Sequence, residues 1–152
     1  MELLASKDNQ DIWFVEVRDL NKIDLSFSSE PLVCIIISNI NVPAPAMKAV
    51  AKHLIAAGCR YGVCFGRECE EWETALDHAY LETDPNYSPP AETMVMTTAH
   101  KNDPLEDVIY FAIYLTQFSD IEFSKYIFLS IGHKDGLKEE ITKEICELWE
   151  IR

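Results

Sequence analysis

Three cysteines recur at five-residue intervals, at Cys59, Cys64 and Cys69, and cysteines close together in sequence often bind zinc. The apolar run 61–65 between the outer two predicts a β-strand. Cys59 and Cys69 would then lie roughly 20 Å or more apart along that strand. Since a zinc–sulfur bond is about 2.3 Å long, we predict no metal site here, and we expect Cys64 to be a small core residue.

Cys69 is the one thiol whose position is compatible with nucleophilic catalysis. It follows a strand and a glycine and lies near the start of a predicted helix, where the helix dipole lowers a thiol pKa. His100 and His133 each follow another predicted strand, so either could act as the base. The neighbouring carboxylates of Glu68 and Glu70 would raise the thiol pKa instead. A cysteine-dependent enzyme is therefore one hypothesis, to be weighed against binding functions.

The elements that must position these residues alternate along the chain. Four short apolar runs at 32–37, 61–65, 93–99 and 126–131 are each followed by a helical pattern, at 46–57, 68–80, 104–118 and 137–149. Continuous apolar runs are typical of strands covered on both faces, and repeated strand–helix units favour parallel strands with helices on both sides. We predict one α/β domain over 1–152, a three-layer sandwich of flavodoxin-like or Rossmann-like type with about five strands.

The first thirty residues are expected to add a strand and a connector to the four strand–helix units of 31–152. The segment 11–17, Asp-Ile-Trp-Phe-Val-Glu-Val, is predicted to form an extra strand at one edge of the sheet. Residues 19–30 then connect it to the first unit. Asp103 precedes Pro104 and lies three residues before Glu106, which predicts an N-cap for the third helix.

In open α/β sheets, ligands bind beyond the carboxyl ends of the strands. Polar residues follow every predicted strand, and the candidate ligand-binding residues are Ser38, Asn39, Arg67, Glu68, Lys101, Asp103 and Lys134. Three of the thirteen Lys and Arg residues are in this set, and helix N-termini at the same edge also attract anions. A small anionic ligand, such as a nucleotide or a carboxylated metabolite, is therefore possible there. No glycine-rich phosphate loop is present, so we predict no cofactor.

A net charge of −13 opposes binding to nucleic acid and to anionic membranes. No apolar run is long enough for a membrane span, and five cysteines, an odd number, favour a reducing compartment. We expect a cytoplasmic protein. Eight carboxylates lie between Glu68 and Glu92, which indicates either a solvated face or a docking face for a basic partner.

The helix predicted at 104–118 carries Tyr110, Tyr114 and Gln117 opposite its main apolar stripe. Tyrosine is favoured at protein interfaces. These residues are therefore candidates for contact with a protein partner or with a second copy of the chain. The alternative is a helix packed on the sheet with tyrosines at its margin.

The segment 57–70, with Trp72 and Asp77 after it, resembles a pattern in small bacterial proteins of unknown function. The pattern comprises a Gly-Cys-x-Tyr opening, a Cys-aromatic-Gly strand end and a Cys-Glu helix start. This resemblance implies an uncharacterised family and no particular activity.

Two functions therefore compete. The leading hypothesis is a non-enzymatic cytoplasmic binding or regulatory domain that recognises a protein partner through acidic and tyrosine-bearing surfaces. The alternative is a small-molecule sensor or cysteine-dependent enzyme. That alternative requires a pocket lined by Arg67, Cys69, His100 and His133, whereas a partner-binding domain can fill this edge with its own side chains.

Overall fold

The computed structural model describes residues 1–23, 25 and 30–151, so residues 24 and 26–29 of the expected connector lie outside it. In chain order the elements are β1 (Glu2–Lys7), β2 (Gln10–Val17), β3 (Leu32–Ser38), α1 (Ala44–Ala56), β4 (Cys59–Gly66), α2 (Cys69–Leu81), η1 (Ala91–Thr93), β5 (Met96–His100), α3 (Leu105–Tyr114), β6 (Lys125–Ile131) and α4 (Leu137–Ile151). Among these described residues, none of the helices combines the length and the apolar character that crossing a membrane requires.

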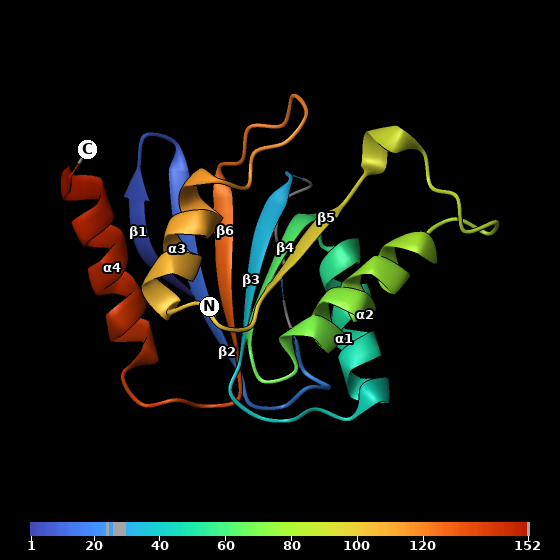
Figure 1. Ribbon diagram of the computed structural model, residues 1–152, viewed down its shortest axis with the longest axis horizontal. Helices are drawn as coiled ribbons and strands as arrows, with labels where there is room; N and C mark the ends of the chain where they lie inside the picture. Colours follow the sequence, from blue (N-terminus) through green and yellow to red (C-terminus); the bar gives the residue numbers. More distant parts are fainter. Residues whose placement is uncertain (24, 26–29, 152) are drawn as a thin grey trace.

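A single sheet of six strands, in the order β1-β2-β6-β3-β4-β5, forms the middle of the molecule (Figure 1). Strands β2, β6, β3, β4 and β5 run parallel to one another, and β1 pairs antiparallel with β2. The predicted mostly parallel sheet is confirmed. The carboxyl ends of the five parallel strands lie at one edge, the lower one in Figure 1, which we call the carboxyl edge.

The strand count and the position of the first predicted strand need correction. The segment predicted as an edge strand is β2, which lies inside the sheet because β1 pairs with its outer side. A two-residue turn joins the two strands, with Asp8 at φ 50° and Asn9 at φ 66°. Asp and Asn tolerate such positive φ angles, and turns of this kind match the twist of a hairpin. A sixth strand is therefore added at the amino-terminal end.

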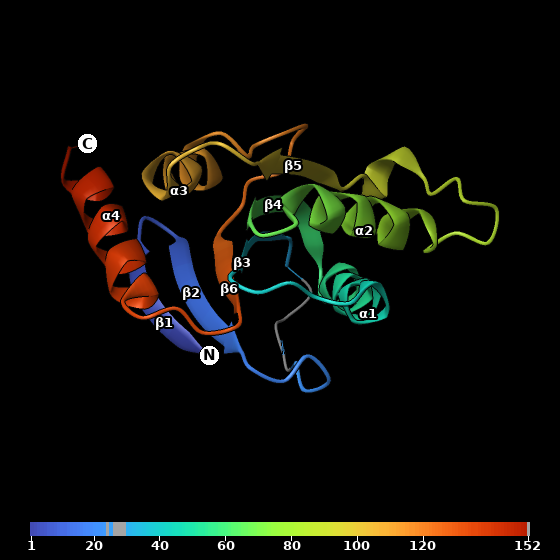
Figure 2. The same cartoon turned by 60° about the horizontal axis from the view of Figure 1, so that its bottom comes forward.

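Helices cover both faces of the sheet, which confirms the three-layer sandwich. Helices α1 and α2 lie on one side and α3 and α4 on the other, as Figure 2 shows. Trp72 and Leu76 of α2 are fully buried in one core, while Ile109 of α3 and Ile145 of α4 are fully buried in the other. Every residue of β3 is buried, as its continuous apolar run predicts for a central strand.

The third strand–helix unit differs most from its prediction. Strand β5 covers Met96–His100, and the residues before it form the short helix η1. Helix α3 ends at Tyr114, four residues earlier than predicted. Its N-cap residue is Pro104, with no side-chain cap. Asp103 was wrongly predicted as that cap, because its carboxylate accepts a hydrogen bond from His100 instead.

Candidate functional site

The chain reverses its direction across the sheet between β3 and β6. From β3 it proceeds through β4 to β5, and it then returns to the other side of β3 as β6. Helices α1 and α3 consequently lie on opposite faces. In open α/β folds a crevice forms at the carboxyl ends of two such strands and commonly holds the ligand.

In this protein side chains of the neighbouring loops occupy that crevice. The Asn39 carboxamide donates to Ser130 Oγ at 2.9 Å and to the Gly132 carbonyl at 3.2 Å. The Ser38 hydroxyl donates to the Ile40 carbonyl at 2.8 Å. Ile40 also packs against Gly132 so closely that a Cβ there would lie 2.9 Å from its side chain. Of Ser38 and Asn39, both predicted to bind a ligand, Asn39 thus links the loop after β3 to the loop after β6, whereas the Ser38 hydroxyl bonds within its own loop.

The turn after β4 is tied to the same loops. Glu68 has a left-handed backbone with φ 58°, and its Oε1 accepts a hydrogen bond of 2.8 Å from the backbone N–H of Val42. The N–H of Arg67 donates to the Ser38 carbonyl at 2.9 Å, while its side chain is exposed. The carboxylate of Glu68 therefore joins the turn after β4 to the loop that precedes α1.

Cys69 begins α2 and points into the core between that helix and the sheet, with only 3% of its surface exposed. Burial raises the pKa of its thiol, and the charge of Glu70 raises it further. Both effects outweigh the hydrogen bonding at the helix start. At neutral pH this thiol is protonated, which makes it a poor nucleophile.

His100 lies on the other face of the sheet from Cys69. Its ring packs against Phe111 of α3 with centroids 4.6 Å apart. Nε2 is 2.8 Å from Thr98 Oγ1, and Nδ1 is 3.1 Å from Asp103 Oδ2. Both ring nitrogens therefore have partners within its own loop and strand, and the expected role as a base for Cys69 has no geometric support.

His133 follows β6, and strands β3 and β4 separate it from His100 on β5. Three strand spacings correspond to about 14 Å. The His133 ring lies 2.6 Å from Glu16 Oε1 and 2.5 Å from Asp135 Oδ1. The hydrogen bonds that the ring donates to these carboxylates, the one to Glu16 first, raise the pKa of His133. Glu16 also accepts from Arg18, and its own pKa is lowered. This group is an ion-pair network at one corner of the carboxyl edge.

A cavity of about 580 Å³ adjoins that network. Its lining includes the predicted ligand residue Lys134, and the charged side chains around it are Glu2, Glu16, Arg18, His133, Lys134, Asp135, Lys138 and Glu139. Positive and negative groups are balanced. Lys101, also a predicted ligand residue, instead forms an ion pair of 3.5 Å with Glu70. Across the described part of the chain, no three His, Cys, Asp or Glu side chains converge as a metal site would require.

Part of the acidic segment between Glu68 and Glu92 is neutralised within the protein. Glu82 accepts from Lys48 at 3.4 Å and from Lys52 at 3.2 Å, which joins α2 to α1. These contacts lower the pKa of Glu82. Glu70 of the same helix is paired with Lys101. Glu73 lies between Glu70 and Asp77, and its pKa is raised by burial first and then by the charges of Asp77 and Glu70.

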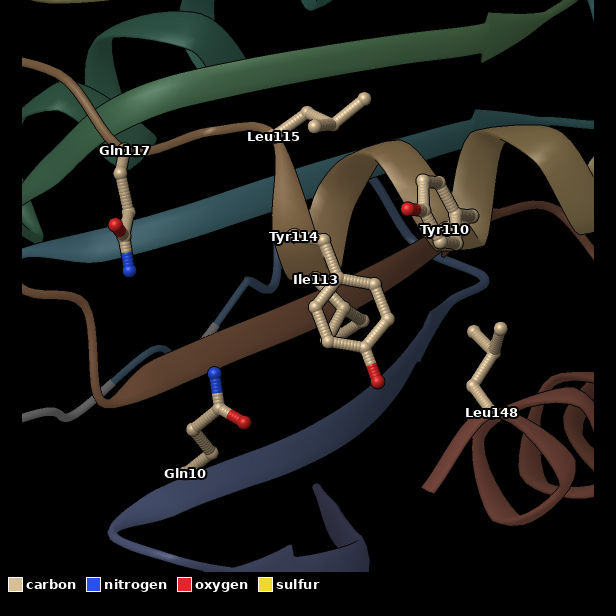
Figure 3. Close-up of a pocket in the computed structure, with 7 residues that line it drawn as sticks. All are labelled: Gln10, Tyr110, Ile113, Tyr114, Leu115, Gln117 and Leu148. Carbon is tan, nitrogen blue, oxygen red and sulfur yellow. The ribbon is translucent and has the colours of Figure 1, made fainter. Parts of the chain in front are cut away.

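A second cavity, of about 550 Å³, lies at the opposite edge of the sheet, where α3 and α4 end and β2 begins (Figure 3). Its lining consists of Gln10, Tyr110, Ile113, Tyr114, Leu115, Gln117 and Leu148, and we call it the tyrosine pocket. All three residues predicted to contact a partner lie here. The carboxamides of Gln10 and Gln117 point toward each other across the pocket in Figure 3.

The tyrosine pocket has an apolar base and an exposed rim. Ile113 is buried, while Tyr110 is 47% exposed and Leu115 is 55% exposed. The rings of Tyr110 and Tyr114 pack together with their centroids 5.1 Å apart. Gln10 and Leu148 could not be assigned to this site from sequence, because they lie more than thirty residues from α3 and only the folded chain brings them together.

A family model described as "Domain of unknown function (DUF7684)" matches residues 12–147. The match begins within β2 and ends within α4, so it covers the crevice, the His133 network and five of the seven residues that line the tyrosine pocket; Gln10 and Leu148 lie just outside it. No curated protein matches the chain. The prediction of an uncharacterised family is confirmed. The chain belongs to the family called Domain of unknown function (DUF7684).

Proposed function

We propose that this chain is a non-enzymatic, cytoplasmic binding domain that recognises a protein partner through the tyrosine pocket. The observation that carries the proposal is the contrast between the crevice at the ends of β3 and β6 and the tyrosine pocket. At the carboxyl edge, Asn39, Ser130 and Gly132 close the crevice with hydrogen bonds of their own. The tyrosine pocket, whose lining is both polar and apolar, stays open, with Tyr110 and Leu115 exposed on its rim.

The chemistry of the pocket favours an apolar side chain as its occupant. A volume of about 550 Å³ is sufficient for a large apolar or aromatic residue, and Ile113, Leu115 and Leu148 provide apolar walls. Gln10 Nε2 donates to Tyr126 Oη at 3.1 Å, so the Gln10 carbonyl and the Gln117 carboxamide are the groups that can bond a peptide backbone beside it. Interfaces typically combine such an apolar anchor with a polar surround.

Charge supports a basic partner rather than a second copy of this chain. Glu106 and Asp107 lie one helical turn before Tyr110, and Glu144 lies one turn before Leu148, so carboxylates flank the pocket. Two copies meeting here would bring these groups together, on molecules of net charge −13 each. A partner with Lys or Arg beside its anchor residue would instead be attracted.

The test begins with selection of peptides from a display library on the immobilised protein. Selected peptides are expected to contain an apolar residue with Lys or Arg beside it. Leu115→Arg should weaken their affinity about tenfold or more, since it replaces a rim contact with a like charge. Leu81→Arg is the matched control, because Leu81 is an exposed leucine on α2, 39% exposed, away from the pocket.

Two results would reject this function. One is that no peptide is enriched, and the other is that Leu81→Arg and Leu115→Arg affect binding equally. Light scattering supplies a separate check on the homodimer that α3 also suggested. A mass of about 17 kDa, the 17.4 kDa of one chain, excludes self-association through the pocket.

A small anionic ligand at the carboxyl edge is the second candidate, because Lys134 and Arg18 line the cavity beside His133. The carboxylates of Glu16 and Asp135 already bond to that histidine and oppose an added anion. A rise in melting temperature with millimolar nucleotides or dicarboxylates, lost in Lys134→Gln, would favour this candidate over the first.

A further inference from the structure

In the described part of the chain, strand β5 is the last strand of the sheet and pairs with β4 alone, so its outer side carries backbone N–H and C=O groups without a strand partner there. The register of β5 against β4 is regular over Met96–His100. Residues 96–99 are uncharged, and none of them is proline. Such an edge is a template for another strand, and proteins usually protect it with charges, bulges or proline.

The other outer strand of the sheet, β1, has that protection. Strand β1 contains a bulge between Leu3 and Ala5, and it carries Glu2 and Lys7 at its ends. Glu2 is further fixed by an ion pair of 3.1 Å with Lys138 of α4. The two outer strands therefore differ, because β1 is protected by a bulge and by charges whereas β5 is not, and β5 is the strand available for pairing.

A row of carboxylates on α2 follows β5 along its length. Glu70 pairs with Lys101 just after the strand, at 3.5 Å, and Asp77 accepts a hydrogen bond of 2.6 Å from Thr97 within it. Glu73 lies between them on the same flank of the helix, at three- and four-residue spacing. Thr97 and Ala99 face this helix, whereas His100 faces α3.

We propose that β5 binds an extended, basic segment of a partner protein, which adds to the sheet as a seventh strand with Lys or Arg at alternate positions. This surface is separate from the tyrosine pocket and goes beyond the function proposed above. Alternate side chains of an added strand would face α2 and meet Glu73 and Asp77. The remaining side chains would lie on the α3 side, beside the exposed Met96.

The spacing of the carboxylates matches this pattern. Glu73 and Asp77 are four residues apart on a helix, which separates them by about 6 Å along the axis. Every second residue of a strand is separated by about 6.6 Å. Two basic side chains at positions i and i+2 can therefore reach both carboxylates. Cations at these positions would also offset the like charges of Asp77 and Glu70, which together with burial, the larger cause, raise the pKa of Glu73.

A second copy of this chain is a poorer occupant. Pairing β5 with β5 of another molecule would bring the α2 flanks of both copies to the same edge. Glu70, Glu73 and Asp77 would then face carboxylates rather than cations, and like charges oppose such contact. Charge complementarity thus selects a basic partner strand.

The experiment uses a fluorescein-labelled peptide, Lys-Val-Lys-Thr-Lys-Val, titrated with the full chain and followed by anisotropy. Its scrambled form, Lys-Lys-Lys-Val-Thr-Val, has the same charge without the alternation. We expect the alternating peptide to bind more tightly. The double variant Glu73→Gln, Asp77→Asn should weaken it about fivefold, the effect of two exposed ion pairs. The matched control, Glu106→Gln with Asp107→Asn, removes the same charge beside the tyrosine pocket.

Amide hydrogen exchange locates the contact independently. With saturating peptide, exchange at Met96–His100 should slow at least fivefold, while exchange in Glu2–Lys7 stays unchanged. The proposal is overturned if the two peptides bind equally well, or if peptide affinity falls only in the Glu106→Gln, Asp107→Asn variant. It is also overturned if the β5 amides are not protected from exchange by the peptide. Protection of β5 in a dimer without peptide would overturn it in favour of a second copy. None of these outcomes depends on the Leu115 experiment.

Discussion

Replacing Gly66 with alanine should destabilise the protein through contact with one backbone oxygen. Gly66 ends β4 with φ +91°, and a Cβ built there would lie 2.3 Å from the Ser38 carbonyl oxygen. That oxygen belongs to the neighbouring strand and also accepts the Arg67 N–H at 2.9 Å. It cannot move aside without distorting the end of β3.

The expected magnitude follows from three contributions. An alanine in a left-handed conformation costs about 1–2 kcal/mol. Overpacking against a fixed backbone atom costs about 1–3 kcal/mol, and loss of the Arg67–Ser38 hydrogen bond costs about 1 kcal/mol. We therefore expect the free energy of unfolding to fall by about 3 kcal/mol or more. For a chain of this size that corresponds to a melting temperature lower by about 6–12 °C.

Gly136→Ala is the matched control, because Gly136 has a similar φ of +78° but no atom lies within 4 Å of the position that a Cβ would take there. It should cost only the conformational part, about 1–2 kcal/mol. Urea denaturation followed by circular dichroism measures both variants at 25 °C. If Gly66→Ala is no less stable than Gly136→Ala, then the close approach of β4 to Ser38 does not constrain the carboxyl edge and the reasoning is wrong.

Three further predictions concern other parts of the molecule. The pKa of His133 is raised above 6.5 by Glu16 and Asp135. An NMR titration of the His133 ring should therefore have its midpoint above that value, and the midpoint should be lower in Glu16→Gln. The stability that the protonated ring adds to the folded protein should disappear as pH rises through its folded pKa. Iodoacetamide at pH 7 should modify Cys146 first, because the other four cysteines are buried; rapid labelling of a buried one would contradict this. Gly62→Ala should cost about 1–3 kcal/mol, because its Cβ would lie 2.5 Å from Leu76 Cδ1. In a double-mutant cycle with Leu76→Ala the two costs should be less than additive by about 0.5 kcal/mol or more, and full additivity would contradict the contact.

The sequence predicted the layers and the direction of the strands because the signals were local. The buried runs of β3 and β6 are continuously apolar over 32–37 and 126–129, and strand–helix alternation favours parallel pairing. Strand β1 was missed because it is short and polar, although the Asp8-Asn9 pair before β2 is a recognisable hairpin turn. The bounds of β5 were shifted because an edge strand lacks the apolar run that marks a central one.

The site could be predicted only in part, because it depends on strand order. The sequence located His100 and His133 at the ends of strands, but it contained no signal that β3 and β4 would separate them. It also could not indicate that Asn39 would bond across to Ser130 and close the crevice. Tyr110 and Tyr114 were identified from helical spacing, whereas Gln10 joins them only through tertiary packing.

The pairing of β2 has a consequence for the order in which the chain can fold during synthesis. Apart from β1, the neighbour of β2 is β6, and Trp13 lies opposite Ile127. A ribosome that has produced the hairpin must add more than a hundred residues before that neighbour exists. Ile12 and Phe14, which are buried in the finished protein, lack their native cover throughout this interval. Closure of the sheet by the last strand is therefore a late, long-range event, and slow elongation would prolong the exposure of an aggregation-prone segment.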